Sequence, residues 1–191
     1  MKSIVTALFV FIGCAFCHAQ TKAESKFHDA KLGLTFPKEI KTFERSEWHR
    51  FDEPELGYSV AYNSLTSAVT VYVYHGGLKR IQSGAGKEAK QQFEQAKRDI
   101  LMAQRLGGYR SVKPLGDTEI KLGGETNGLT ALKATFEIAR NEGETMSMLV
   151  LTGHKNHFVK LRCTYPKHLK ASSEKHFAAF LEEFGKLLNT P

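Results

Sequence analysis

The chain is poor in cysteine. It has three in 191 residues, and two of them, Cys14 and Cys17, lie within the first nineteen. If that leader is removed, Cys163 remains alone, and a single cysteine excludes an internal disulfide. Cys163 lies in an apolar strand-like run, so we expect its thiol to be buried and inert rather than a nucleophile. The fold must therefore rest on its hydrophobic core.

Long apolar and long basic runs are also missing. The most apolar stretch, residues 4–17, is shorter than the about 20 residues that a membrane-spanning helix needs. The net charge is +7, but no run of five or more basic residues occurs, and in residues 87–105 the basic side chains alternate with acidic ones. This pattern is typical of a solvated helix face. We therefore expect no nucleic-acid partner and, once the leader is removed, no transmembrane span.

Familiar catalytic motifs fail on their spacing or order. Residues 57–61 approach the GxSxG elbow of serine hydrolases, but they precede the His75-Gly76-Gly77 segment that would have to form the oxyanion loop. The nucleophile elbow must follow that loop and enter a helix. Residues 83–87 lack the first glycine and the final Ser or Thr of a phosphate-binding loop. We therefore expect neither enzymatic activity nor a cofactor.

What the chain does contain is an export pattern at its N-terminus. Lys2 provides a positive start, residues 4–12 form an apolar core, and Ala19 is the small residue that signal peptidase requires. These are the three parts of a secretory signal peptide. We expect residues 1–19 to be a signal peptide that is cleaved after Ala19.

The remainder, residues 20–191, has the length and composition of a single globular domain. The whole chain is 41% hydrophobic and 25% charged, which are ordinary values for soluble proteins. We expect this domain to be secreted or periplasmic. The alternative is a lipoprotein that is anchored through Cys14.

Two segments have the periodicity of amphipathic helices. Apolar residues recur three or four positions apart in Lys87–Leu106, and Gly107-Gly108 follows as a stop signal,. A second helix is expected to begin near Ser172 or Ser173, either of which can cap it. Its broad apolar stripe comprises Phe177, Phe180, Leu181, Phe184, Leu187 and Leu188. We expect this C-terminal helix to pack on a sheet.

The other segments predict antiparallel strands. The clearest runs are Tyr58–Tyr62, Ala68–Tyr74, Thr118–Leu122, Leu129–Ala139, Thr145–Thr152 and Phe158–Thr164. The first two indicate a hairpin and the last four a four-stranded meander with short, turn-rich connections. Leu32–Pro37 and Ser46–Phe51 are expected to be short strands. The fold class is therefore α+β, with the mid-chain and C-terminal helices packed on the sheet.

Alternation within the strands predicts their faces. Val159, Leu161 and Cys163 share one side of the last strand and indicate its core face,. Lys160 and Arg162 share the other side, which we expect to be solvated.

The element order, the opening Gly33-Leu34-Thr35-Phe36-Pro37 and the final amphipathic helix resemble the PsbP-like fold, including small bacterial envelope proteins of that type. The resemblance covers most of residues 20–191. Such domains act mostly as accessory or binding modules rather than enzymes, and the resemblance implies the same role here.

Two places are candidates for a binding site. His154 and His157 lie three residues apart in a predicted turn and could bind zinc or copper, although an exposed polar hairpin tip explains the same residues without a metal,. Tyr72 and Tyr74 share one side of a strand whose opposite side carries the valines of residues 69–73. If the two tyrosines face outward, they form a surface for a sugar or peptide; the alternative is that a loop or helix packs over them.

The sequence thus predicts an exported, non-catalytic accessory or binding module. Its partner would be an envelope protein or cell-surface component. The alternative is a small metal- or ligand-binding protein that uses the His154/His157 tip.

Overall fold

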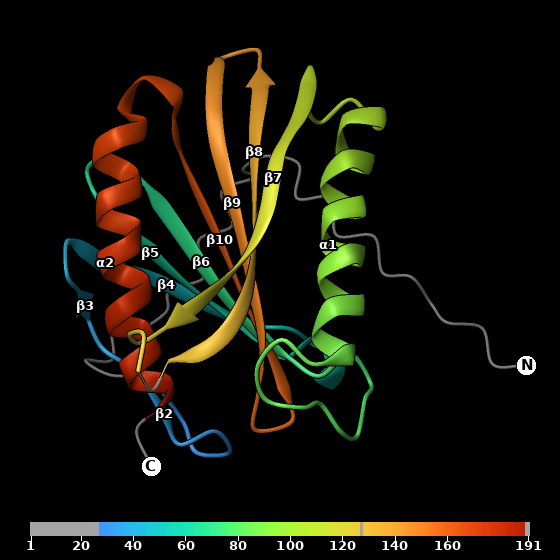
Figure 1. The fold of residues 1–191 in the computed structure, drawn as a ribbon, viewed down its shortest axis with the longest axis vertical. Coiled ribbons are helices and arrows are strands. Elements are labelled where there is room, and N and C mark those ends of the chain that lie inside the picture. The colour runs from blue at the N-terminus through green and yellow to red at the C-terminus, as the bar shows by residue number, and fades with distance from the viewer. Residues whose placement is uncertain (1–26, 127, 190–191) are drawn as a thin grey trace, which may run out of the picture.

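The strands form one large antiparallel sheet in the computed structural model, which describes residues 27–126 and 128–189 (Figure 1). In spatial order the sheet contains eight strands: β3 (Glu39–Ile40), β4 (Phe43–Arg50), β5 (Tyr58–Asn63), β6 (Ala68–Tyr74), β10 (His157–Pro166), β9 (Gly143–His154), β8 (Leu129–Arg140) and β7 (Ser111–Leu122). A separate two-stranded sheet contains β1 (Phe27–Asp29) and β2 (Leu34–Phe36). The α+β fold class is confirmed.

Two helices lie on opposite faces of the large sheet (Figure 1). α1 (Lys87–Arg105) packs chiefly against β7, β8 and β9, whereas α2 (Lys170–Leu188) packs against β7, β10 and the short strands β2 and β3. The sheet is therefore the middle layer, and alternate residues of its central strands enter different cores.

The core beneath α2 is the larger and more aromatic of the two. Its buried residues include Phe36, Phe43, Tyr62, Val71, Val150, Leu161, Phe177, Phe180 and Phe184. The core beneath α1 includes Ile81, Phe93, Ile100, Ala134, Phe136, Leu149, Leu151 and Phe158. Both helices use the apolar faces that their periodicity predicts, because each has a stripe of buried residues at spacings of three and four,.

The predicted hairpin and meander are confirmed, and one long-range pairing joins them. β5 and β6 form the hairpin, and β7, β8, β9 and β10 form the meander. β10 then pairs with β6 along seven registered residues, from Phe158 opposite Tyr74 to Thr164 opposite Ala68. This pairing brings together segments that lie far apart in the sequence.

Some strand bounds differ from those expected. β7 begins at Ser111 rather than Thr118, because a register shift between Pro114 and Gly116 lets the strand continue past these two breakers,. The expected strand at Ser46–Phe51 is the second part of β4. Leu32–Pro37 contains β2, but this strand pairs with β1 and not with the large sheet.

The two helices differ in how well their ends were predicted. α1 ends at Arg105, and Gly107 follows with a φ of 78°, the left-handed conformation that glycine adopts readily,. α2 begins at Lys170 rather than near Ser172 or Ser173, since a 3-10 turn at Lys167–Leu169 leads directly into it. Neither serine caps the helix: the Ser172 hydroxyl donates to the Leu169 carbonyl at 3.0 Å.

The predicted signal peptide, residues 1–19, lies outside the described residues. Within the part of the chain that the structure describes, neither helix has the length and apolarity to cross a membrane.

Candidate functional site

The Tyr72 and Tyr74 side chains project from the face of β6 opposite its valines. Val69, Val71 and Val73 are buried in the core beneath α2, whereas both tyrosines are only partly buried on the α1 side of the sheet. The alternation along β6 therefore separates a purely apolar face from an aromatic one.

Lys160 lies against both tyrosine rings. It is registered opposite Tyr72 on the adjacent strand β10, and its Nζ is 4.5 Å from the centre of the Tyr72 ring and 5.4 Å from that of Tyr74. The Tyr74 ring also contacts the Phe158 ring at 5.4 Å. The ammonium group is thus held by two aromatic faces, a favourable arrangement for a cation.

Arg162 follows two residues later on the same side of β10. Its Nη2 donates to the Ser147 hydroxyl at 2.8 Å, while its buried Nε has no hydrogen-bond partner among the described residues. The Tyr109 side chain lies beside this guanidinium. Arg140, from the end of β8, places its own guanidinium 4.9 Å from the centre of the Tyr109 ring.

These residues form a basic aromatic cluster: Tyr72, Tyr74, Tyr109, Arg140, Lys160 and Arg162. They come from β6, β8, β10 and the loop after α1. Only the two tyrosines of β6 were predicted as site residues. The pattern of Lys160 and Arg162 was visible in the sequence, but its meaning depends on the pairing of β6 with β10.

Lys160 and Arg162 are not on a solvated face, contrary to the expectation from alternation. Both are partly buried. On the other side of β10 they are registered opposite Leu151 and Leu149, which belong to the core beneath α1. The prediction was wrong because alternation identifies which residues share a face and does not show which helix covers the neighbouring strand.

Burial changes the acid–base properties of the cluster. Desolvation, followed by the nearby Arg162 charge, lowers the pKa of Lys160 to about 8, and Asp99 of α1 opposes this shift. Desolvation also lowers the pKa of Arg162 and raises that of Tyr72. A partly buried cation without a close counter-ion is destabilised in this way.

The carboxylates of the described residues do not neutralise the cluster directly. No Asp or Glu oxygen among them lies within 4.0 Å of the charged atoms of Lys160, Arg162 or Arg140. Asp99 is the acidic group that acts on Lys160, and its Oδ1 already accepts a hydrogen bond from Gln95 at 2.8 Å. The cluster therefore has a surplus of positive charge.

The predicted histidine tip, residues 154–157, is hydrogen-bonded to neighbouring segments. His154 and His157 are registered opposite each other where β9 meets β10. The Lys155 ammonium donates to the Leu32 carbonyl at 2.9 Å, and the Ile81 amide donates to the Asn156 side chain at 3.3 Å. Lys155 and Asn156 are exposed, as expected of a hairpin tip.

The two imidazoles at this tip differ in their surroundings. His154 is buried, and desolvation lowers its pKa, which favours the neutral imidazole that binds metals,. The His157 ring lies 6.0 Å from that of His75, between ring centres. Among the described residues, no group of three or more His, Cys, Asp or Glu side chains is arranged to hold a metal ion. The metal site stays a prediction.

Cys163 is buried, as predicted. Its side chain has no exposed surface, and desolvation raises the pKa of the thiol to about 12. A thiol in this state is a poor nucleophile at neutral pH.

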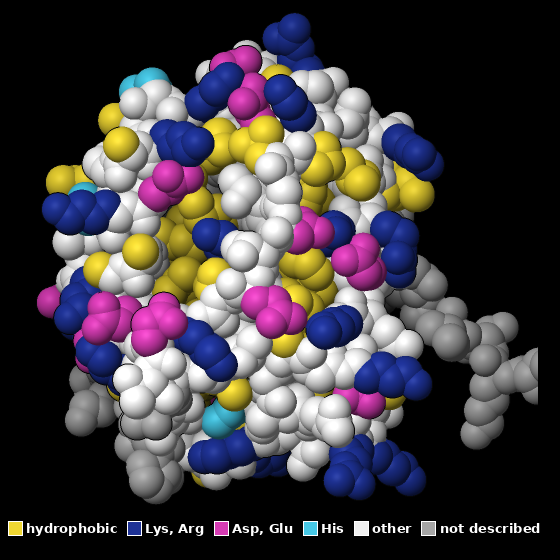
Figure 2. Space-filling view, in the orientation of Figure 1, with side chains coloured by type: hydrophobic (Ala, Val, Ile, Leu, Met, Phe, Trp, Pro, Cys, Tyr) yellow, Lys and Arg dark blue, Asp and Glu magenta, His cyan; other side chains and the backbone are white. Residues whose placement is uncertain are grey.

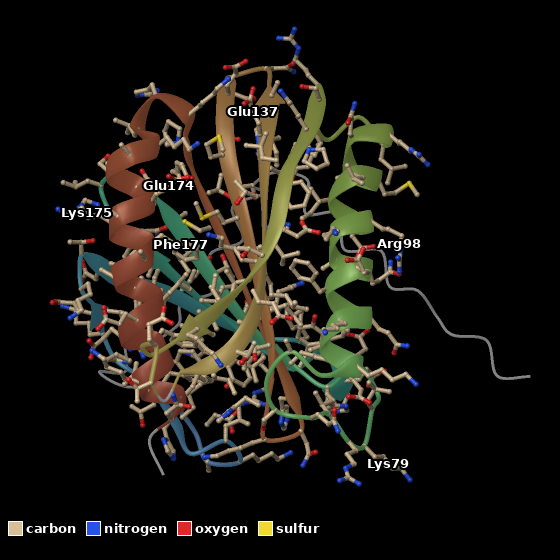
Figure 3. All side chains as sticks on the ribbon, in the orientation of Figure 1. Lys79, Arg98, Glu137, Glu174, Lys175 and Phe177 are labelled. Atoms are coloured by element: carbon tan, nitrogen blue, oxygen red, sulfur yellow. The ribbon has the colours of Figure 1, made fainter. Side chains whose placement is uncertain are left out.

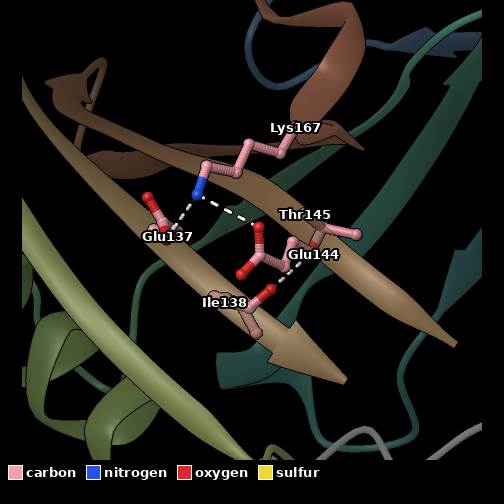
Figure 4. A network of polar contacts seen from close by, with 5 residues as sticks. All are labelled: Glu137, Ile138, Glu144, Thr145 and Lys167. Atoms are coloured by element: carbon pink, nitrogen blue, oxygen red, sulfur yellow. Dashed lines mark hydrogen bonds and ion pairs between the residues drawn. The ribbon is translucent and has the colours of Figure 1, made fainter. Parts of the chain in front are cut away.

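The remaining charged groups form mixed networks. Lys167 donates to Glu137 at 2.7 Å and to Glu144 at 3.1 Å, which links the 3-10 turn before α2 to β8 and β9 (Figure 4). Lys and Arg side chains alternate with Asp and Glu across the face around β7, where recessed apolar surface is visible on both sides of the strand (Figure 2). The ion pairs of Lys167 with Glu137 and Glu144 are partly exposed, and such pairs contribute little to the free energy of unfolding,.

Comparison with known proteins shows a likeness of fold alone. No family model matches the chain, and no curated protein matches it. The solution structure of cyanobacterial PsbP (CyanoP) from Synechocystis sp. PCC 6803 is 9% identical with a TM-score of 0.46, and the match covers 86% of this chain and 96% of that one. The crystal structure of PA94 from Pseudomonas aeruginosa, a protein of unknown function described as a putative regulator, is 9% identical with a TM-score of 0.41; coverage is 82% and 92%. The predicted weak resemblance to the PsbP-like fold is confirmed.

Proposed function

We propose that this protein is a non-catalytic binding module whose binding surface is the sheet face around Tyr72 and Tyr74. The observation that carries the proposal is the partial exposure of these tyrosines, because α1 packs chiefly against β7, β8 and β9 at the other end of the same face. The nearby side chains Ser59, Ala61 and Thr70 are partly exposed as well. An aromatic surface beside a helix offers apolar area to a partner, although the Tyr74 hydroxyl itself is buried,.

Binding rather than catalysis is the better interpretation of the groups present. The Cys163 thiol is buried with a raised pKa. The basic aromatic cluster contains cations and phenols, and the pKa of Tyr72 is raised by burial, which keeps this phenol neutral. Such groups bind charge and aromatic or polar surface.

Site-specific photo-crosslinking tests the proposed surface. A photoreactive amino acid at Ser59, on β5 beside Tyr72, is expected to trap a partner in cells. The matched control carries the same group at Lys175, which is exposed on α2 and projects away from the sheet (Figure 3). Trapping from Lys175 alone, or equal trapping from both positions, would contradict the proposal.

The proposal includes export, supported by the leader pattern in residues 1–19,. The partner would then be an envelope protein or cell-surface component. Intact mass analysis of the protein from its own cells is expected to show a chain that begins at Gln20. A lipid-modified chain beginning at Cys14 would instead support the lipoprotein alternative, and an uncleaved chain would overturn the export proposal.

A second candidate is metal binding at the histidine tip, favoured by the registered pair His154 and His157 with the ring of His75 close to His157. Protein purified without chelators would then contain one equivalent of zinc or copper. His154→Ala would lose both this metal and its thermal stabilisation, whereas His176→Ala on α2 would keep them. Metal-free protein that gains no stability on adding zinc or copper would end this hypothesis.

A further inference from the structure

The basic aromatic cluster carries more positive than negative charge. Lys160, Arg162 and Arg140 are three cations, and Asp99 is the acidic group that acts on Lys160. Lys160 and Arg162 lie two residues apart on one side of β10 and are both desolvated; the Arg162 charge disfavours the charged form of Lys160, and the Arg140 charge disfavours that of Arg162. A folded protein does not gain stability from such an arrangement. Its presence therefore points to a role in binding.

Arg162 also has a hydrogen-bond donor that lacks a partner. The Nε of Arg162 is buried and has no partner among the described residues, while Nη2 of the same side chain is oriented by Ser147. A buried donor without a partner costs roughly 1–3 kcal/mol. An acceptor supplied by a ligand would remove this cost.

Cation–π contacts hold these side chains in place without neutralising them. Lys160 rests on Tyr72 and Tyr74, and Arg140 rests on Tyr109, so both heads are fixed before any ligand arrives. Fixed donors lose little conformational entropy on binding. Lys160 and Arg162 share one side of β10, and Arg140 is close enough for its charge to act on Arg162, so these cations can act on one small anionic group.

From this geometry we propose that the cluster is a binding site for an oxyanion, specifically the phosphate group of a ligand. This inference rests on the proposed function, since it names the chemistry that the Tyr72 surface would recognise. Three cations against one carboxylate leave two positive charges, which a phosphate group near neutral pH can balance. Arginine binds phosphate through directed N–H donors, and lysine binds it as a point charge.

Titration with inorganic phosphate, followed by NMR or calorimetry, tests the site. We expect saturable binding of one phosphate per chain, weakened about tenfold or more by Arg162→Gln and by Lys160→Met. Arg80→Gln and Lys175→Met remove the same charges from exposed positions and are expected to leave the affinity unchanged. Tyr109→Phe removes only a hydroxyl and serves as a milder variant if the first two fold poorly.

Separate arms distinguish the sources of the phosphate. A soluble sugar phosphate and vesicles containing phosphatidic acid are compared, with neutral phosphatidylcholine vesicles as the blank. Binding of either phosphate source that depends on Arg162 supports the proposal and identifies the source. Absence of saturable binding to all three probes, or equal weakening by the two exposed control variants, would overturn it.

The proposed function can survive that failure. Crosslinking from Ser59 that persists in Arg162→Gln would show a binding surface that does not use an anion. Wild-type protein that binds phosphate but traps no partner from Ser59 would show an anion site without the proposed partner surface. The two experiments therefore fail independently.

Discussion

At the residue scale, Lys160 shows how a position beside a hydrophobic core lowers the pKa of a lysine side chain. Its ammonium group is enclosed by Tyr72, Tyr74 and Arg162, and the Asp99 charge restores only part of the lost solvation. The pKa falls from 10.5 to about 8, so an appreciable fraction of the side chain is neutral at slightly alkaline pH. The charge of the cluster therefore depends on pH and on any anion bound there.

This shift predicts a pH dependence of stability. Between pH 8 and 10.5 the unfolded chain holds the Lys160 proton more tightly than the folded chain, so the free energy of unfolding rises with pH across this window,. Urea unfolding at a series of pH values is expected to show this rise for wild type and Lys175→Met, and to show it reduced in Lys160→Met. A constant difference between wild type and Lys160→Met across the window would contradict the shifted pKa. Saturating phosphate is expected to shrink the rise, because an anion restores the lysine pKa toward its ordinary value.

The two predicted tyrosines and the two cations that contact them differ in how much the sequence reveals. The alternation of Tyr72 and Tyr74 with valines is local and was sufficient to place them on a separate face,. The same rule applied to Lys160 and Arg162 gave the correct side of the strand and the wrong environment. Their desolvation comes from Leu149, Leu151 and the aromatic rings of neighbouring strands, which alternation along β10 does not show.

At the scale of elements, α2 is held on the sheet by aromatic packing and by one close backbone approach. Phe180 contacts the rings of Phe43 and Tyr62 at 5.1 and 5.4 Å between centres. Five residues further toward the C-terminal end of the helix, Gly185 lies directly against the backbone of Leu122 and Gly123, where a Cβ atom would overlap that backbone. Glycine is required at that point for the helix to reach the end of β7.

We therefore predict that Gly185→Ala destabilises the protein. In a free helix the same change stabilises by about 1 kcal/mol, but here the added methyl group would separate α2 from the turn after β7 and cost roughly 1–3 kcal/mol. Chemical unfolding monitored by circular dichroism provides the measurement. Lys175→Ala, in an exposed position of the same helix, is expected to change the free energy of unfolding by at most about 0.5 kcal/mol. A stabilised Gly185→Ala variant would rule out the close approach.

The start of α2 shows where element prediction fails. Ser172 and Ser173 are good capping residues, and the apolar stripe begins only at Phe177, so the local signals favoured a later start,. The chain instead enters the helix through the 3-10 turn at Lys167–Leu169, whose Lys167 is bound by Glu137 and Glu144 of two strands (Figure 4). Such tertiary contacts are not encoded in the spacing of capping residues.

At the scale of the whole molecule, the two helices divide the sheet unequally. On one face of the sheet, α2 packs across the central strands. On the other face, α1 packs near the β7 end and leaves the side chains of β5 and β6 partly exposed. The basic aromatic cluster lies at the boundary between the covered and the exposed parts. Desolvated charge and accessible surface meet at this boundary.

Cys163 offers a probe of the whole fold, because its thiol is buried in the α2-side core. With a pKa of about 12, it is expected to resist alkylation by iodoacetamide at pH 8 until the molecule unfolds,. Mass spectrometry after labelling at increasing urea concentrations measures the labelled fraction. This fraction is expected to follow the unfolding transition seen by circular dichroism. Rapid labelling without urea would show that the strand carrying Cys163 opens separately from the rest of the fold.

The amino-acid sequence by itself determined the α+β class, the two helices, the hairpin and the meander, because each depends on periodicity and turn residues within a few positions of one another. Only the tertiary structure decided that β6 pairs with β10, and this pairing assembles Tyr72, Tyr74, Lys160 and Arg162 into one cluster. It also decided which of the two helices covers which face. Contacts between distant segments depend on the summed burial of many side chains, and no local pattern carries that sum.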